Sequence, residues 1–276
     1  MQTRLLLNLF LFITVLALAV TAWFVYQDKH AVNYLSSLPP AQVNRIVIPR
    51  EHGDIILSAT GDNWRMEKPY KLPAHNFRVQ SLLGLLQTPV NQSYASSELD
   101  LSQLGLMPAR ASILFNDREI RFGKANPVNH KRYLFSEQRV YLLDDSLYPL
   151  VSAEAASLVS LSLLEPGMTI QTISLPDITL KKMPDKTWHD QHGKSVSADS
   201  AQQLLDNWRD ASAYAVHAYM SRDKARAVKL ELDNQTTIHF LVATDNNAVI
   251  IGHPEAGVEY HLDAQYADSL LNIPSN

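Results

Sequence analysis

The sequence predicts an α+β protein in which an N-terminal transmembrane helix precedes two tandem related units of small, mostly antiparallel sheets with helices. Three observations predict it: an uncharged apolar run at the N-terminus, short apolar runs separated by turn residues, and a series of short sequence motifs that occurs twice in the same order. The predicted parts are a transmembrane signal-anchor helix over 1–29, a linker over 30–42, and units over 43–165 and 166–276.

The N-terminal run extends from Leu5 to Tyr26 and carries no charged residue. A helix of this length spans roughly 33 Å, close to the ~30 Å hydrocarbon core of a bilayer. Asn8 and Thr14 interrupt it, and Trp23 and Tyr26 stand at its distal end, where aromatic residues favour the headgroup region. The run therefore predicts a membrane span.

The flanking charges predict its orientation. Arg4 and the α-amino group precede the span, and the charges of Asp28 and Lys29 cancel after it. Because the more positive flank stays in the cytoplasm, we expect a single-pass protein of the bacterial inner membrane with residues 30–276 in the periplasm.

A cleaved signal peptide is the alternative interpretation of this segment. Val20 and Ala22 are small residues that suit a cleavage site, although the apolar run continues beyond them. A buried soluble helix is a third interpretation, and it would normally show a polar face.

Composition excludes several classes of function. The 276 residues include no cysteine, which excludes disulfides, thiolate nucleophiles and cysteine-ligated metals. The net charge is −4, and no basic stretch is present to follow a phosphate backbone, which argues against nucleic-acid binding. Neither a GxGxxG nor a GxxxxGK[ST] phosphate loop occurs.

The first unit begins with strand patterns. A hairpin is predicted around the turn at 51–54, and a strand through Trp64 to Met66 follows. A helix is predicted over about 76–87, with an apolar face that includes Phe77 and Leu82. Further strands are predicted at 109–115, 119–122, 133–135 and 140–143, and a helix at 146–164.

The same order recurs after Pro166. Trp188 matches Trp64, and a helix with Leu204, Leu205 and Trp208 matches the first leucine-rich helix. The sequence predicts a duplicated β-β-α-β-β-β-type unit. The other paired marks are residues 211–214 with 91–94, 225–227 with 109–111, and 258–263 with 139–144.

The first unit also resembles a known family. A strand hairpin and the Trp64 strand are followed by Pro69, a leucine-rich helix, the run Leu101–Leu106 with Pro108, and a hairpin that ends at Gly123. This ordered set, completed by 132–134 and 140–141, resembles the bacterial proteins that carry a domain of unknown function, DUF4340. The resemblance implies a membrane-anchored extracytoplasmic protein, similar in some members to accessory parts of ABC-type exporters, and it implies no catalytic residue.

His189 and His192, with Asp190 between them, are the best candidates for metal binding. They fall in a polar turn, which predicts a solvated loop unless His239, His253 or His261 lies nearby. Ser221 and Lys224 have the spacing of a Ser-x-x-Lys pair, but they do not lie on a clear helix.

Other candidate groups have ordinary structural interpretations. Trp64 and Trp188 are expected to be core residues rather than ligand platforms. Two Asn-x-Ser/Thr patterns, at Asn91 and Asn234, are common by chance. The candidate carboxylates, Asp54, Asp62, Glu98, Asp100, Asp144 and Asp145, stand near predicted turns, where aspartate has a backbone role.

We therefore expect a non-enzymatic accessory protein with no catalytic, cofactor-binding or metal-binding residue and no cofactor. Its expected partners are the membrane and a protein of the cell envelope, such as a transporter subunit, and nucleic acid is not expected. Two alternatives stay open: a periplasmic module that binds a ligand in the cleft between the repeats, and a metal-dependent envelope hydrolase that uses His189, His192 and a carboxylate.

Overall fold

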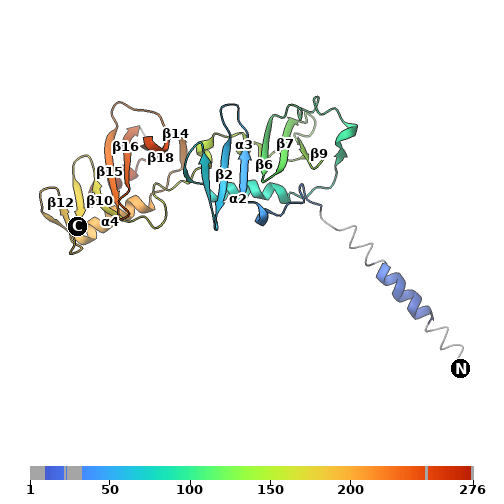
Figure 1. Cartoon of the computed structure of the whole chain (residues 1–276), viewed down its shortest axis with the longest axis horizontal. Coiled ribbons are helices and arrows are strands. Elements are labelled where there is room, and N and C mark those ends of the chain that lie inside the picture. Colours follow the sequence, from blue (N-terminus) through green and yellow to red (C-terminus); the bar gives the residue numbers. More distant parts are fainter. Residues whose placement is uncertain (1–9, 22, 24–32, 246–247, 275–276) are drawn as a thin grey trace, which may run out of the picture.

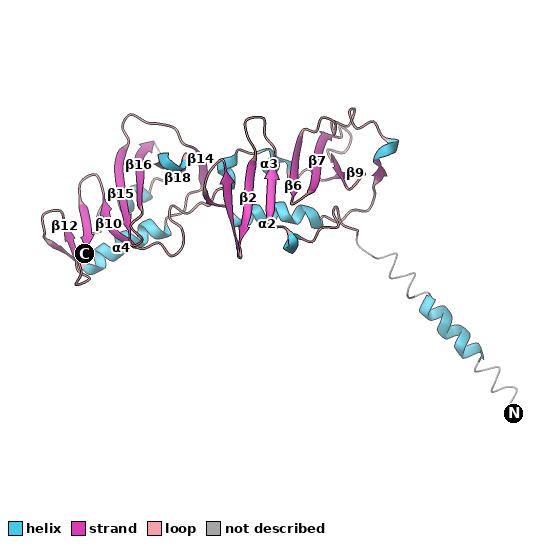
Figure 2. Ribbon diagram, in the orientation of Figure 1, coloured by secondary structure: helices cyan, strands magenta, loops and turns pink. Residues whose placement is uncertain are grey.

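Two antiparallel nine-stranded sheets form the body of the protein, one in each unit. The computed structural model describes residues 10–21, 23, 33–245 and 248–274. The two units lie side by side along the long axis of the molecule, and each sheet carries a helix, α2 or α4, across one face (Figures 1 and 2). The prediction of an α+β chain with two related units is confirmed.

The strand order of the first sheet is β4-β3-β2-β1-β6-β7-β8-β9-β5, and every neighbouring pair is antiparallel. The strands are β1 (Arg45–Ile48), β2 (Ile55–Thr60), β3 (Asn63–Lys68), β4 (Leu72–Pro73), β5 (Tyr94–Ala95), β6 (Ala111–Phe115), β7 (Arg118–Ala125), β8 (Arg132–Ser136) and β9 (Arg139–Leu143).

The second sheet has the order β13-β12-β11-β10-β15-β16-β17-β18-β14, which is the first order with each number raised by nine. This identity of topology confirms the duplication. The strands are β10 (Ile170–Ser174), β11 (Thr179–Lys182), β12 (Trp188–Asp190), β13 (Ser195–Val196), β14 (Ala215–Ala218), β15 (Arg226–Leu232), β16 (Thr237–Asp245), β17 (Ala248–His253) and β18 (Val258–Asp263).

In each unit one helix joins the two edges of the sheet. The chain leaves the edge strand β4 or β13, crosses the sheet as a helix, and returns as the opposite edge strand β5 or β14. The crossing buries one face of the helix against the sheet. The helices are α2 (Asn76–Gly84), α3 (Tyr148–Ser152), α4 (Ala198–Asp210) and α5 (Tyr266–Leu271), with 3-10 turns η1 (Pro40–Gln42), η2 (Leu85–Gln87), η3 (Ser96–Glu98), η4 (Ala155–Leu158) and η5 (Pro254–Ala256).

The core contains both predicted tryptophans. Trp64 and Trp188 are buried, which confirms that they are core residues. Phe77, by contrast, was predicted on the apolar face of α2 and is 75% exposed. Phe77 is two positions before the buried Val79, so the two side chains point to opposite sides of the helix.

The helix predicted over 146–164 is wrong beyond its first turns. The chain forms only α3 and η4, and then Val159 pairs with Ala74 and Ser162 pairs with Ser212. Extended pairing brings Leu163 and Leu164 into a hydrophobic core that is continuous through both units. Burial between the units therefore outweighs the local preference for a helix.

Residues 33–42, within the segment interpreted as a linker, pack onto the first unit. Leu35 is buried, its N–H donates to the carbonyl of Thr88, and Tyr34 forms a β-bridge with Pro89. The oxygen Oε1 of Glu137 accepts hydrogen bonds from the hydroxyls of Ser36 and Ser37 and from the N–H of Ser37. The first unit thus begins before Val43.

Residues 10–21 are helical, and their large apolar side chains are exposed in all directions, with Phe10 at 70% and Leu16 at 55%. The predicted span, Leu5–Tyr26, lies partly outside the described residues. Among the described residues, no helix combines the length and apolar character needed to cross a membrane.

Candidate functional site

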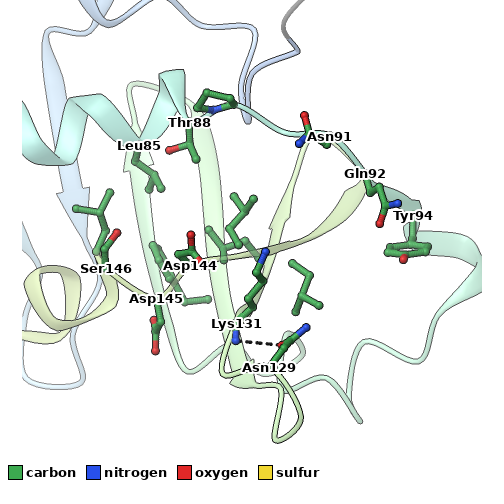
Figure 3. Close-up of a pocket in the computed structure, with 16 residues that line it drawn as sticks. Leu85, Thr88, Asn91, Gln92, Tyr94, Asn129, Lys131, Asp144, Asp145 and Ser146 are labelled. Atoms are coloured by element: carbon green, nitrogen blue, oxygen red, sulfur yellow. Dashed lines mark hydrogen bonds between the residues drawn. The ribbon is translucent and has the colours of Figure 1, made fainter.

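A pocket of about 710 Å³ opens in the first unit, beside the edge formed by β9 and β5. Figure 3 shows the segment from Thr88 to Tyr94 along one side of it and Lys131 with Asp144 and Ser146 along the other. The volume falls within the range of about 300–1,000 Å³ that is usual for ligand sites.

The lining divides into an apolar floor and a polar rim. The rim combines neutral groups with one cation, Lys131, and the carboxylates of Asp144 and Asp145. The floor lies under η2 and along β7 to β9, with Phe122, Leu134 and Leu143 on the core face of the sheet and Leu142 on the opposite face. Its residues are Leu85, Phe122, Leu134, Leu142, Leu143 and Leu147, and the neutral rim residues are Thr88, Asn91, Gln92, Tyr94, Asn129 and Ser146.

Comparison of the two sheets shows why the pocket exists. In the second unit, β14 forms four residue pairs with β18, from Ala215 with His261 to Ala218 with Val258. In the first unit, β5 forms only two pairs with β9, Tyr94 with Val140 and Ala95 with Arg139. The gap left by the missing pairs is where the pocket opens.

The hydrogen bonds that follow each edge strand fix which residues correspond. Ser96 donates its N–H to the carbonyl of Gln138, and Tyr219 donates to the carbonyl of Gly257 in the same place. Tyr94 therefore corresponds to His217, and the sequence pairing of 91–94 with 211–214 is wrong by three residues. That pairing matched the tyrosines Tyr94 and Tyr214, whereas the register of a strand is set by its hydrogen-bonded pairs with the neighbouring strand.

By this register Asn91 corresponds to Tyr214, and Leu142 corresponds to His261. Tyr214 donates its N–H to the carbonyl of His261 at 2.9 Å. Across the described stretches 88–95 and 139–147, no backbone hydrogen bond joins residues 91–93 to β9. The edge of β9 is thus unpaired from Tyr141 onward.

Arg132 supports the wall of the pocket beside Asp145. Its Nε and Nη2 donate to the two carboxylate oxygens of Asp145 at 2.6 and 2.7 Å, and its guanidinium lies 3.6 Å from the centre of the Tyr148 ring. The register of β8 with β9 makes Val249 the counterpart of Arg132. The buried cation, like the pocket, is a feature of the first unit.

The second unit has a different polar cluster at the corresponding edge. The buried carboxylate of Glu259 accepts hydrogen bonds from both terminal nitrogens of Arg222, from Nε2 of His261 and from the N–H of Met220. Burial raises the pKa of Glu259, but these donors outweigh it and lower the pKa to about 2. The cluster fixes residues 219–222 against the sheet.

The predicted metal candidates lie at the end of β12 and in the turn after it: His189 and Asp190 are half-buried strand residues, and His192 is exposed in the turn. His189 contacts the carbonyl of Gly193 and the hydroxyl of Thr187, and Asp190 accepts the N–H groups of His192 and Lys194. These bonds hold the turn between β12 and β13, so the prediction of a solvated turn is confirmed for His192, while His189 and Asp190 belong to the strand.

The other histidines lie far from that turn. Three strands separate β12, which carries His189, from β16, which carries His239, so about 19 Å lies between the two strands. His239 pairs with Glu255, and burial lowers the pKa of His253. Within the described parts of the chain, no three histidine or acidic side chains are grouped in a way that would hold a metal ion.

The remaining candidates are also dispersed. Ser221 and Lys224 are exposed outside any helix, and Arg222 between them binds Glu259. Asp100 accepts the N–H groups of Ser102 and Gln103, which is the backbone role expected of aspartate in a turn.

A smaller hollow of about 220 Å³ lies between the two units, where the sequence analysis had a ligand cleft as an alternative. Arg78, Glu154 and His217 line it, and His217 Nδ1 lies 3.9 Å from a carboxylate oxygen of Glu154. The N–H of Ala213 donates to the carbonyl of Leu161 at the same junction, which ties the units together. The larger pocket lies within the first unit.

Of the residues that line the large pocket, the sequence singled out only Asp144 and Asp145 as candidate functional groups, and it favoured a backbone role in a turn for both. Asn91 and Gln92 entered only as part of a glycosylation pattern and of the repeat pairing of 91–94 with 211–214. The signal that was available is the contrast between Asn91-Gln92-Ser93 and Tyr214-Ala215-Val216, since the amides favour β-structure less than the tyrosine and valine.

The comparison with known families identifies the chain. The sequence profile of a family described as a domain of unknown function, DUF4340, matches residues 64–248. The chain belongs to the DUF4340 family. The match starts at Trp64 in the first unit and ends at Ala248 in the second, so the family's domain includes most of both units of the duplication. The curated proteins and the solved structures contain no match to this DUF4340 protein.

Proposed function

We propose that this DUF4340 protein is a non-enzymatic accessory protein, tethered to the inner membrane of a bacterium by residues 5–26, whose two units bind a protein partner on the periplasmic side. The partner that we propose is a component of an ABC-type transporter or of another envelope complex.

One observation supports the proposed membrane tether. The run Leu5–Tyr26 is uncharged, and the described part of it is a helix whose apolar side chains the folded units leave uncovered. A helix that is apolar on every side is typical of burial in a large core or in a bilayer. The flanking charges favour a cytoplasmic N-terminus.

The tether would make the first unit the one nearest the membrane. Six residues separate Tyr26 from Asn33, and a fully extended chain covers at most about 3.6 Å per residue, so Asn33 would lie within about 25 Å of the end of the span. Val90 donates its N–H to the carbonyl of Asn33, beside the mouth of the large pocket. The pocket would then be within reach of a membrane-embedded partner.

The non-enzymatic part of the proposal is supported by the positions of the candidate groups. Ser221 and Lys224 lie in an exposed turn, and the two sides of the His189–His192 turn bind each other. Nucleophilic and metal-assisted catalysis both need such groups to converge on a pocket.

Replacing Leu5–Tyr26 with a cleavable signal peptide tests the tether. The expected result is a folded protein that fractionates with the soluble periplasm, while the unaltered chain stays in the membrane pellet after a carbonate wash. If the replaced chain stays in the pellet, the tether is wrong. The double variant Leu16→Lys and Leu18→Lys is a second test. A lysine at the centre of a span costs about 3 kcal/mol of insertion free energy, so we expect this variant to be partly lost from the membrane pellet.

A ligand-binding module is a second candidate, and the large pocket with its apolar floor and polar rim favours it. Thermal-shift measurements against envelope metabolites test it, since a bound ligand raises the melting temperature in a saturable way. A shift that Ser146→Trp abolishes would support the pocket in the first unit as the site.

A further inference from the structure

We propose that the unpaired edge of β9 receives an extended peptide segment of a protein partner, which adds to the first sheet as an antiparallel strand over the large pocket. The proposal deepens the partner-binding part of the proposed function by naming the surface and the form of the bound segment. It does not depend on the tether.

The second unit shows why we expect an extended peptide segment at this edge. There the chain itself fills the corresponding edge: residues 214–218 run along β18 with four ladder pairs and the bond from Tyr214 to the carbonyl of His261. In the first unit the ladder stops at Tyr94, and the carbonyl of Leu142 lacks the corresponding bond from Asn91. The same sheet thus accepts a strand at this edge in one copy and leaves it open in the other.

The strand β9 itself has neither lysine nor proline, and the segment 88–94 lies across the pocket from its open edge without pairing with it beyond Tyr94. Exposed sheet edges are usually protected by lysine, proline or a covering loop. The unpaired part of β9 carries Leu142 and Leu143, which are partly exposed apolar residues. An edge of this kind favours addition of a strand from another chain, with main-chain hydrogen bonds for affinity and pockets for alternate side chains.

The pocket offers room and chemistry for a short strand. Three residues in a strand extend about 10 Å, and the space of about 710 Å³ lies between β9 and residues 88–94. The floor of Phe122 and Leu134 suits one apolar side chain. The rim combines a cation, Lys131, with the carboxylate of Asp144 on the same side, so a segment without net charge fits best.

The sequence of β14 provides a probe with these properties. A synthetic, acetylated and amidated peptide with the sequence of residues 212–219, Ser-Ala-Tyr-Ala-Val-His-Ala-Tyr, carries no carboxylate, lysine or arginine. Its native counterpart runs antiparallel to β18, and the proposal predicts that the free peptide runs antiparallel to β9.

The experiment measures binding of this peptide to the full chain in detergent micelles, by fluorescence anisotropy and by hydrogen exchange. We expect saturable binding and slower exchange of the amides of residues 141–144. A peptide with the same side chains but N-methylated at alternate residues is expected to bind at least about tenfold more weakly, because it cannot complete the ladder.

Two protein variants provide the matched comparison. Leu142→Asp places a charge at the open edge and is expected to weaken binding at least about tenfold, since the peptide would have to bury that carboxylate. Val128→Asp places the same charge in the exposed loop between β7 and β8 and is expected to leave binding unchanged. Circular dichroism and the melting temperature of each variant check that it is folded.

The proposal is overturned if no saturable binding is seen up to about 1 mM peptide, since a dissociation constant above that value would correspond only to a weak contact. It is also overturned if the N-methylated peptide binds equally well, which would indicate a site for side chains alone, or if protection falls outside β9. A failure of membrane tethering would show in fractionation and would leave these measurements unaffected.

Discussion

Arg222 holds the buried carboxylate of Glu259 through both terminal nitrogens, at the edge of the second sheet where residues 219–222 fold onto β18. The corresponding position on β9 is Val140, an apolar residue. The two copies of one fold therefore carry opposite chemistry at the same place. The second copy closes its edge with an ion pair and a full strand, and the first leaves a pocket.

The Arg222–Glu259 pair is expected to make stability depend on pH. The pKa of Glu259 in the folded protein is about 2, below the unfolded value of 4.5, so its contribution is complete above about pH 4.5 and is lost as the pH falls toward 2. Arg222→Met should lower the free energy of unfolding by about 3 kcal/mol at pH 7, because the carboxylate stays buried without its partner.

Urea unfolding at pH 7 and pH 4 measures this effect, and the loss should be smaller at pH 4. Arg226→Met is the control, since the exposed Arg226 lies 3.6 Å from Asp177 and should change stability by less than about 0.5 kcal/mol. Equal losses in the two variants would contradict the role of the buried pair.

The pair of Arg132 and Asp145 should show strong coupling. Arg132→Val alone leaves Asp145 and the carbonyl of Gly123 without a donor, and it should cost about 3 kcal/mol. The double variant with Asp145→Ala reproduces the residues of the second unit, Val249 and Ala264, and should cost less than the single variant. A double-mutant cycle of thermal or urea unfolding measures the coupling energy, and additive losses would contradict it.

Glu137 is expected to hold the start of the first unit. Burial raises the pKa of this carboxyl, but hydrogen bonds from Ser36 and Ser37 outweigh it and lower the pKa. The bonds are therefore fully present above the unfolded pKa of 4.5 and weaken as the pH falls below it. Glu137→Gln should speed proteolysis between residues 33 and 42 at pH 7.

Limited proteolysis followed by mass spectrometry detects this cleavage. Glu98→Gln is the matched control, because Glu98 is exposed in η3 and lies outside the contact. Equal rates of cleavage in both variants would show that Glu137 does not hold the segment.

Two glycines should respond in opposite directions to alanine. A Cβ at Gly123 would lie 2.4 Å from the carbonyl oxygen of Leu104, a backbone atom, so Gly123→Ala should be destabilising by more than about 1 kcal/mol. Gly84 has helical backbone angles in α2 and open space around it, so Gly84→Ala should stabilise the protein by up to about 1 kcal/mol. Denaturant unfolding compares both with the unaltered chain, and a stable Gly123→Ala would contradict the close approach.

Much of the fold could be predicted from the sequence, because apolar and polar residues alternate along the long strands. The pattern of β16, with Ile238, Phe240 and Val242 buried, is of this kind. The two-residue strands β4, β5 and β13 are too short to show a period, so the predicted unit lacked them. The helix expected after Ser146 ends early because its apolar residues are buried between the units, a cause that is not local.

The candidate site could not be predicted in the same way. The pocket arises from a strand pairing that is present in one copy and missing in the other. Its residues, such as Asn91 and Leu142, lie about fifty positions apart and carry no catalytic spacing. Conversely, His189 and His192 have a suggestive spacing, and the structure places them at the end of β12 and in the turn after it, where the hydrogen bonds are made locally.

Measuring on which side of the membrane the C-terminus lies tests the proposed function most directly. Alkaline phosphatase, which needs disulfides that form outside the cytoplasm, and green fluorescent protein can each be fused after Asn276 and expressed in a bacterial host. The account predicts an active phosphatase fusion that stays with the membrane. An inactive phosphatase fusion, together with a fluorescent protein fusion that is bright in the cytoplasm, would contradict it.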